Sequence, residues 1–133
     1  MVTQAQFAAA VYDFNTRISR LLLLCKAAGL RVKITCRFRS DKQQETLYSI
    51  GRTRPGRIAT NCRPGQSPHN HELATDFAIL VNGKCDWNGS GSRWRLFGVL
   101  VREAKLTWGG NFKSIKDCPH VELPGWTKYK KVK

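Results

Sequence analysis

Two histidines and two carboxylates form the most chemically suggestive constellation in the chain. His69 precedes Asp76 by seven positions, and Asp117 precedes His120 by three positions much later in the sequence. A catalytic zinc site uses three nitrogen or oxygen ligands and leaves a fourth position for water. His69, Asp76 and His120 can supply these ligands, and the spacing predicts that Asp117 lies close to the bound water.

The chemistry that these residues predict is metal-assisted hydrolysis. Zinc can lower the pKa of bound water to about 7, and a nearby carboxylate can take the water proton and later return it to the leaving amine. Arg39 directly follows a strand-like segment and is our candidate cation for stabilising the oxyanion. The residues alone leave a plainer interpretation open, in which His69 lies in an ordinary turn and Asp76 is a hydrogen-bonded structural residue.

The first elements that must position these residues are a long helix, a strand and a short helix. Apolar residues at spacings of four and three predict an amphipathic helix over residues 1–28. Alternating apolar and polar residues predict a half-buried strand over 31–38. Ser40 and Gln43 have capping-box spacing, which predicts the start of a short helix.

The segments that hold the candidate ligands come later in the sequence. Residues 51–67 are rich in Gly, Pro, Arg and Thr and predict a long loop, of the kind that is functional or disordered. Residues 73–81 predict a strand that holds Asp76, followed by a turn. A second helix is expected over 92–105, and His120 opens a last short strand that ends at Leu123.

Composition predicts one strongly basic domain. The 133 residues include 23 Lys and Arg against 9 Asp and Glu, and the formal net charge is +14. On charge alone, nucleic acid is the favoured partner, ahead of anionic bacterial envelope polymers and of a merely soluble surface. The longest apolar run, 21–25, is too short to span a membrane. The first residues lack the basic and apolar regions of a signal peptide.

The five cysteines are widely and irregularly spaced. No C-x-x-C pair occurs, which argues against a zinc ribbon or a thioredoxin-like redox site. Without an export signal we expect reduced thiols. Each cysteine is therefore interpreted as a small buried apolar residue rather than as a ligand or nucleophile.

Several segments together resemble one peptidase family. The sequence SPHNHELATD at residues 67–76 is similar to the S-x-H-x-x-G-x-A-x-D signature of the D-Ala-D-Ala carboxypeptidase/VanY-type zinc peptidases. Residues 81–88 and the closing D-x-x-H-V-E-L at 117–123 resemble the phage endolysin branch, which contains L-alanyl-D-glutamate endopeptidases. The segments at 38–48 and 51–60 also resemble the family, so the resemblance covers roughly residues 35–123 in the family's order.

The resemblance implies a role for each residue that matches a family motif. Arg39 is implied to hold a substrate carboxylate or the developing oxyanion, and Ser67 to contact the substrate. Asp117 is implied to be the general base. The implied Zn²⁺ ligands are His69, Asp76 and His120.

Three positions bear on how closely the family pattern is followed. Glu72 stands where the family has glycine, and we expect the backbone there to avoid the left-handed conformation and the side chain to be solvated. Phe38 replaces a tyrosine, which removes a hydroxyl and affects packing only. His71 is expected to face solvent or a further carboxylate rather than a metal.

The leading hypothesis is an α+β zinc peptidase with the hedgehog/D-Ala-D-Ala peptidase-like fold, in which a small antiparallel sheet carries the zinc site and helices flank it. Residues 1–133 would form one catalytic domain without a separate cell-wall-binding domain. The expected activity is that of an endolysin cutting the L-Ala–D-Glu bond of peptidoglycan for host lysis. One alternative is a D-Ala-D-Ala carboxypeptidase, and another is a basic nucleic-acid-binding protein with a structural metal. No nucleic-acid motif and no basic-aromatic array supports the last.

These expectations extend to partners and location. Peptidoglycan would be the substrate, and the basic tail at residues 128–133 would contact anionic envelope polymers. Nucleic acid binding and stable membrane insertion are not expected, and the protein would act as a monomer. We expect it in the host cytoplasm until a holin releases it to the cell wall. The positive charge is then interpreted as a means of staying near an anionic envelope.

Overall fold

The computed structural model describes residues 2–130. Its first element is the helix α1, Gln4–Ala27, as the apolar spacing predicts. The Thr3 side chain accepts a hydrogen bond from the Gln6 backbone amide, and the Gln6 side chain accepts one from the Thr3 amide. These reciprocal bonds satisfy two amides that a helix start leaves without a partner. The buried face of α1 comprises Ala10, Phe14, Ile18, Leu21 and Cys25.

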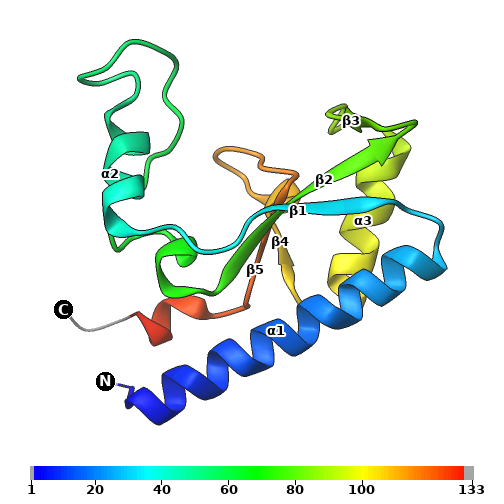
Figure 1. Cartoon of the computed structure of the whole chain (residues 1–133), viewed down its shortest axis with the longest axis horizontal. Helices are drawn as coiled ribbons and strands as arrows, with labels where there is room; N and C mark the ends of the chain where they lie inside the picture. The colour runs from blue at the N-terminus through cyan, green and yellow to red at the C-terminus, as the bar shows by residue number, and fades with distance from the viewer. Residues whose placement is uncertain (1, 131–133) are drawn as a thin grey trace.

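Two further α-helices lie at opposite ends of the sheet (Figure 1). The helix α2, Asp41–Ser49, begins at the predicted capping box of Ser40 and Gln43. The helix α3, Ser92–Glu103, buries Trp94 and Phe97 as predicted. Between α2 and the sheet runs the loop 51–67, which leads into a short 3₁₀ helix, η1, Pro68–His71.

The sheet has five strands among the described residues: β1 (Val32–Cys36), β2 (Ala74–Val81), β3 (Lys84–Asp86), β4 (Thr107–Trp108) and β5 (His120–Glu122). It is antiparallel throughout and has the order β1-β2-β5-β4, with β3 pairing to the C-terminal part of β2. The predicted strands are confirmed with shorter bounds, whereas β4 and the 3₁₀ helices η2 (Gly109–Asn111) and η3 (Trp126–Tyr129) were not predicted. Three helices and a small antiparallel sheet make this an α+β fold.

The hydrophobic core lies where α1 and α3 cover the sheet (Figure 1). Phe97 of α3 contacts Phe77 of β2 and Trp94, with ring centroids 5.4 Å apart in both pairs. Phe14 and Leu21 of α1 complete the same cluster and are almost fully buried. Each such side chain contributes about 1.5–3 kcal/mol when it is removed from water. The core therefore fixes β2, the strand that carries Asp76, against two helices.

Burial of the cysteines differs from the expectation. Cys25 is buried in the core, but Cys36, Cys62 and Cys118 are half-buried and Cys85 is exposed. All five are free thiols. Among the described residues, no helix combines the length and apolar character that a membrane crossing would require.

Candidate metal centre

The register of the sheet brings three polar side chains together. On one edge of β2, Cys36 pairs with Asp76, and on the other edge Asp76 pairs with His120. Residues directly opposite each other in antiparallel strands point to the same face, with Cβ atoms about 4.5–5.5 Å apart. The pairing of β1 shifts between Ile34 and Cys36, as at a β-bulge, so that Cys36 meets Asp76. Asp76 is therefore flanked by a thiol and an imidazole.

His69 reaches the same face from η1. The Ser67 hydroxyl accepts a hydrogen bond from the His69 amide at 3.3 Å, which caps this short helix. The Arg39 amide donates to the His69 carbonyl, and the Asn70 side chain donates to the Arg39 carbonyl at 2.8 Å. These bonds join η1 to the chain that follows β1, and they place His69 over Asp76.

A tight turn places Asp117 beside His120. The His120 amide donates to the Asp117 carbonyl at 3.0 Å, and the Asp117 amide donates to the Gly109 carbonyl at 2.9 Å. A Cβ atom on Gly109 would lie 2.3 Å from the Asp117 carbonyl oxygen and 2.9 Å from the His120 Cβ. Only glycine fits this close approach, so Gly109 belongs to the support of the site.

Two imidazole nitrogens face one oxygen of Asp76. The His69 Nε2 lies 3.2 Å and the His120 Nδ1 lies 3.3 Å from the Asp76 Oδ1. The other nitrogen of each ring already has an acceptor. His69 Nδ1 lies 2.9 Å from the Arg37 carbonyl oxygen, and His120 Nε2 lies 2.7 Å from the Glu122 carboxylate.

This pattern determines which nitrogens carry protons. A carbonyl and a carboxylate only accept, so the His69 Nδ1 and the His120 Nε2 must donate. In a neutral imidazole the other nitrogen then carries no proton and presents a lone pair. Both lone pairs point at a carboxylate oxygen, which is repulsive unless a proton or a metal cation lies between them. The arrangement therefore requires positive charge at the Asp76 oxygen.

The same requirement appears in the pKa values of the metal-free site. Burial alone would lower the pKa of His69, but its hydrogen bonds with Asp76 and Cys36 raise the pKa to about 9. Burial is likewise outweighed at His120, where Asp76 and Glu122 raise the pKa. Burial would raise the pKa of Asp76, yet hydrogen bonds from the two histidines hold it below its ordinary value. A metal ion can take the place of these protons.

The donor set fits a divalent metal. Asp76, Asp117 and His120 each offer a ligand atom, and these atoms lie within 4.8 Å of one another. The His69 Nε2 faces the same Asp76 oxygen from the other side. Two imidazoles and carboxylate oxygens are the ligands that zinc uses in catalytic sites. Hydrogen bonds to Arg37 and Glu122 orient the two rings in the way that metal-ligating histidines require.

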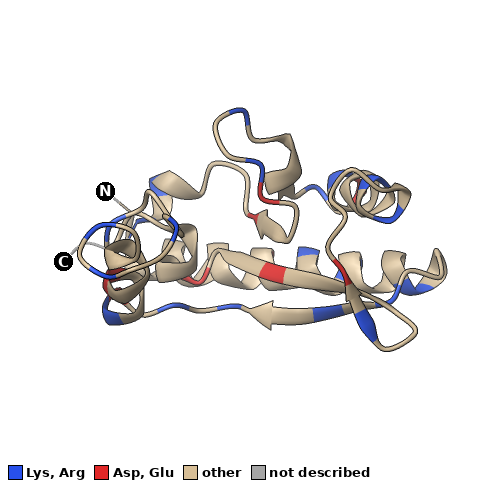
Figure 2. Cartoon of the chain, turned by 90° about the horizontal axis from the view of Figure 1, so that it is seen from above, with Lys and Arg blue, Asp and Glu red and all other residues tan. Residues whose placement is uncertain are grey.

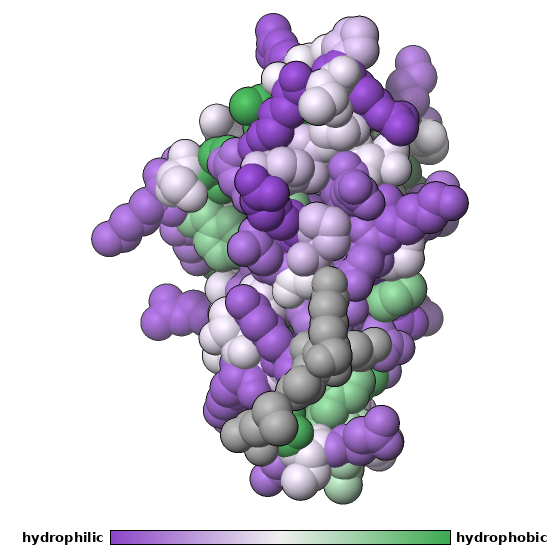
Figure 3. All heavy atoms as spheres, turned by 90° about the vertical axis from the view of Figure 1, so that its left-hand side faces the viewer, coloured by the Kyte–Doolittle hydropathy of each residue, from purple (hydrophilic) through white to green (hydrophobic). Residues whose placement is uncertain are grey.

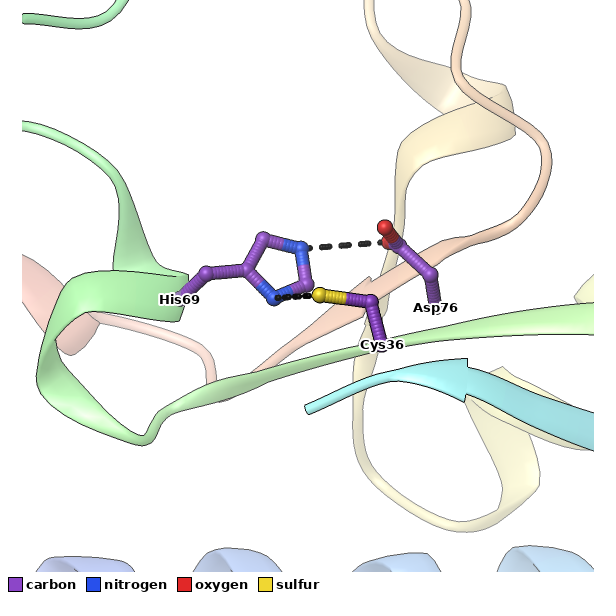
Figure 4. Close-up of side chains that lie close together, drawn as sticks. All are labelled: Cys36, His69 and Asp76. Atoms are coloured by element: carbon purple, nitrogen blue, oxygen red, sulfur yellow. Dashed lines mark hydrogen bonds and ion pairs between the residues drawn. The ribbon is translucent and has the colours of Figure 1, made fainter. Parts of the chain in front are cut away.

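Cys36 forms a second potential ligand group with His69 and Asp76, whose ligand atoms also lie within 4.8 Å of one another. Figure 4 shows one nitrogen of the His69 ring directed at the Cys36 thiol and the other at the Asp76 carboxylate. The Cys36 Sγ lies 3.9 Å from His69 Nδ1, the nitrogen that donates to Arg37. The contact with His69 is the main influence that lowers the pKa of the Cys36 thiol. Through the strand pairing, Cys36 lies on the side of Asp76 away from His120.

Arg39 and Asp117 provide the remaining functional groups. The Arg39 guanidinium lies 3.9 Å from the Asp76 carboxylate and donates to the Gln44 side chain at 3.1 Å. Partial withdrawal from water is the main influence that raises the pKa of the Asp117 carboxyl, and the charge of Asp76 adds to it. Asp117 is nevertheless exposed, unlike the buried His69 and His120, so it can meet water and substrate.

All six residues predicted for the site border one pocket of about 400 Å³. The loop 51–67 and α2 form part of its wall, and Phe112 and Trp126 add aromatic rings. The structure therefore brings together the residues that the motifs predicted. They are Arg39, Ser67, His69, Asp76, Asp117 and His120.

Two functional residues were missed from the sequence. The Glu122 carboxylate accepts a hydrogen bond from His120 Nε2, and its position two residues along the same strand puts it on the same face. That spacing was a usable signal. Gln44 is fully buried and joins Arg39 to the carbonyl of Cys62, which its place in a polar helix did not indicate.

Two expectations for residues close to the candidate ligand His69 were wrong. Glu72 adopts the left-handed conformation, with φ 61°, because it ends η1, and its amide donates back to the Pro68 carbonyl. This helix end needs that conformation whatever the side chain. His71 does not face solvent. It is buried, its Nε2 lies 2.8 Å from the Gly65 carbonyl oxygen, and its ring stacks on Trp126.

Comparisons with known proteins agree with this geometry. Residues 61–123 match the family model described as D-alanyl-D-alanine carboxypeptidase. The peptidoglycan L-alanyl-D-glutamate endopeptidase CwlK of Bacillus subtilis is 41% identical over 103 residues, which cover 71% of this chain and 62% of CwlK. The chain thus spans less than two thirds of the length of this relative.

Two solved structures show the same fold. The Serratia marcescens L-Ala D-Glu endopeptidase ChiX matches with a TM-score of 0.65 and 20% identity, over 97% of this chain and 93% of ChiX. The LD-carboxypeptidase LdcB matches with a TM-score of 0.67 and 19% identity, over 89% of this chain and 60% of LdcB. The matched residues 61–123 hold all four candidate site residues with metal-binding or base chemistry: His69, Asp76, Asp117 and His120. Over these residues, the chain is similar to the D-alanyl-D-alanine carboxypeptidase family of peptidases.

Proposed function

We propose that this protein is a zinc-dependent endopeptidase that hydrolyses the L-Ala–D-Glu bond of the peptidoglycan stem peptide. The observation that carries the proposal is the convergence of two imidazole lone pairs on Asp76, with Asp117 in reach and a pocket above them. The choice of bond is supported by the names of CwlK and ChiX, both L-Ala–D-Glu endopeptidases.

His69 Nε2, the Asp76 carboxylate and His120 Nδ1 would hold the metal. Zinc, when bound in such a site, lowers the pKa of water and polarises a carbonyl. The Asp117 carboxyl would take the proton of the attacking water and transfer it to the leaving amine, and its raised pKa makes it a stronger base. Arg39 would hold a substrate oxygen, while Gln44 keeps its guanidinium in place. Ser67 and Phe112 border the space for the peptide.

The test is digestion of purified sacculi by the wild-type protein and by Asp117→Asn. We expect the wild type to release peptides with new N-terminal D-Glu, and Asp117→Asn to lose this activity by about 10²-fold or more while zinc content and fold are kept. Asp13→Asn is the matched control, because this substitution makes the same charge change on α1, where Asp13 pairs with Arg17. Full activity in Asp117→Asn would show that another group is the base.

The products also decide between two peptidase activities. The family description and the likeness to LdcB favour a carboxypeptidase as the second candidate. Release of free D-Ala in place of new D-Glu termini would establish that alternative. A wild-type protein that binds no zinc and releases neither product would contradict both activities.

We further propose that the enzyme serves host lysis and reaches the wall from the cytoplasm after a holin opens the membrane. This rests on the resemblance of residues 81–88 and 117–123 to phage endolysins. Expression in bacteria with and without a pore-forming protein tests it, because lysis should depend on the pore. The basic tail expected to contact the envelope lies partly outside the described residues, since residues 131–133 are not described.

A further inference from the structure

The loop 51–67 beside the pocket is strongly basic. It holds four arginines, and the sequence has no Asp or Glu between Glu45 and Glu72. Figure 2 shows basic residues on several separate segments of the chain, so a high overall charge alone would not single out this loop. Its position does, because Ala59, Thr60 and other loop residues border the pocket that holds the candidate ligands.

One of the four arginines holds the loop together. Arg52 Nη1 donates to the carbonyls of Tyr48 and Thr60, and its Nη2 donates to Asn61. Its guanidinium also lies 3.7 Å from the centroid of the Tyr48 ring. The buried Gln44 adds a second anchor by donating to the Cys62 carbonyl at 2.8 Å. The loop is thus a bonded structure with a defined place beside Arg39.

The other three arginines form what we call the arginine rim: Arg54, Arg57 and Arg63. All three residues are exposed, and the Arg63 guanidinium lies 5.0 Å from the Tyr48 ring centroid. Figure 3 shows the end of the molecule that carries α2 and this loop, and hydrophilic side chains dominate its surface. The rim therefore presents positive charge to solvent on the same loop whose residues Ala59, Thr60 and Cys62 border the pocket.

The pocket itself, unlike the arginine rim, carries more negative than positive charge. It carries three carboxylates, those of Asp76, Asp117 and Glu122, against the single guanidinium of Arg39. A bound divalent cation would only neutralise this excess of negative charge. The pocket thus gives little long-range attraction for an acidic ligand, and such attraction must come from charges around it.

We infer that the arginine rim binds the carboxylates of an acidic peptide substrate that lie outside the pocket. This inference rests on the proposed function, and it adds that substrate charge is recognised away from the reacting bond. Exposed ion pairs are individually weak and are screened by salt. The rim should therefore act mainly on KM and at low ionic strength, and it should leave kcat almost unchanged.

The test uses the zinc-loaded protein and two synthetic tripeptides, L-Ala-γ-D-Glu-L-Lys with a C-terminal carboxylate and the same peptide with a C-terminal amide. For the wild type we expect kcat/KM to be about ten-fold higher for the acid at low salt, and about two-fold higher at about 0.5 M salt. The triple variant Arg54→Gln/Arg57→Gln/Arg63→Gln should treat the two peptides almost equally. Its melting temperature should match that of the wild type, because Arg52 is kept.

A matched control removes three positive charges elsewhere, with the triple variant Arg20→Gln/Arg31→Gln/Lys33→Gln. These three residues are exposed and lie on α1, just before β1 and on β1. This control should keep the wild-type preference for the acid. An unchanged preference in the rim variant, or an equal loss in both triple variants, would overturn the inference. If the wild type cleaves neither peptide, the proposed function fails, and titration calorimetry with the same peptides and variants still decides whether the rim recognises the carboxylate.

Discussion

Replacing Glu122 by glutamine tests whether the centre is organised as described. His120 Nε2 lies 2.7 Å from the Glu122 carboxylate, and the two side chains are only 8% and 15% exposed. The carboxylate can only accept, so it fixes the proton on Nε2 and leaves Nδ1 free for the metal. A glutamine amide can rotate and donate instead, which would favour the ring form with its proton on Nδ1. That form cannot bind metal through Nδ1.

Two independent considerations give the size of the effect. A hydrogen bond to a charged group contributes about 1.5–3 kcal/mol net when it is protected from water. Loss of a hydrogen-bond partner behind a metal ligand weakens metal binding by about 10–100-fold, and at about 1.4 kcal/mol per ten-fold this covers about 1.4–2.8 kcal/mol. The two ranges agree. We therefore expect Glu122→Gln to raise the zinc dissociation constant by about 10–100-fold.

The assay is zinc competition with a chromophoric chelator, together with ¹⁵N NMR of the histidine rings. Glu103→Gln on the exposed surface of α3 makes the same charge change and should bind zinc as the wild type does. In the wild type the His120 proton should be found on Nε2, and in Glu122→Gln a share of it should move to Nδ1. Wild-type zinc affinity and an unchanged His120 ring form in Glu122→Gln would refute the reasoning.

Two further predictions concern pH and the buried glutamine. In the metal-free protein the pKa of His69 is raised to about 9, so its stabilising effect is complete below the unfolded pKa of about 6.5 and is lost as the pH rises through 9. Urea unfolding should show the free energy of unfolding falling by on the order of 2 kcal/mol from pH 6.5 to 10, and bound zinc should remove most of this slope. Gln44→Leu leaves Arg39 and the Cys62 carbonyl without their shared partner. It should lower the free energy of unfolding by about 1–3 kcal/mol and kcat/KM by about ten-fold, measured by urea unfolding and peptide hydrolysis.

The sequence predicted the elements whose signals are local. The start of α2 after Ser40 follows from a side chain that bonds to the amide three residues away. The two histidines, Asp76 and Asp117 were identified as candidates from their spacing and from the family resemblance. The structure explains why they meet, because the antiparallel register pairs Asp76 directly with His120.

Of the features that the sequence did not predict, the conformation of Glu72 depends on the short helix η1 beside it, and the burial of His71 and Gln44 depends on contacts with other segments. The left-handed backbone of Glu72 is imposed by the end of η1, and a propensity argument alone favoured the opposite. His71 is buried because Trp126 stacks on it and Gly65 accepts its hydrogen bond, and both partners come from other parts of the chain. The burial of Gln44 likewise becomes evident only once the loop 51–67 folds back over α2.

The pairing of Asp76 with residues on both of its neighbouring strands determines when, during synthesis of the chain, the site can form. β1 and β2 can pair as soon as both have left the ribosome, but β5, which brings His120, follows β2 by about 40 residues. A nascent chain that ends before residue 117 has neither the proposed base, Asp117, nor the last proposed metal ligand, His120. Under the proposed function, hydrolytic competence is acquired only once this third strand has been made, so fragments left by interrupted translation would be inactive.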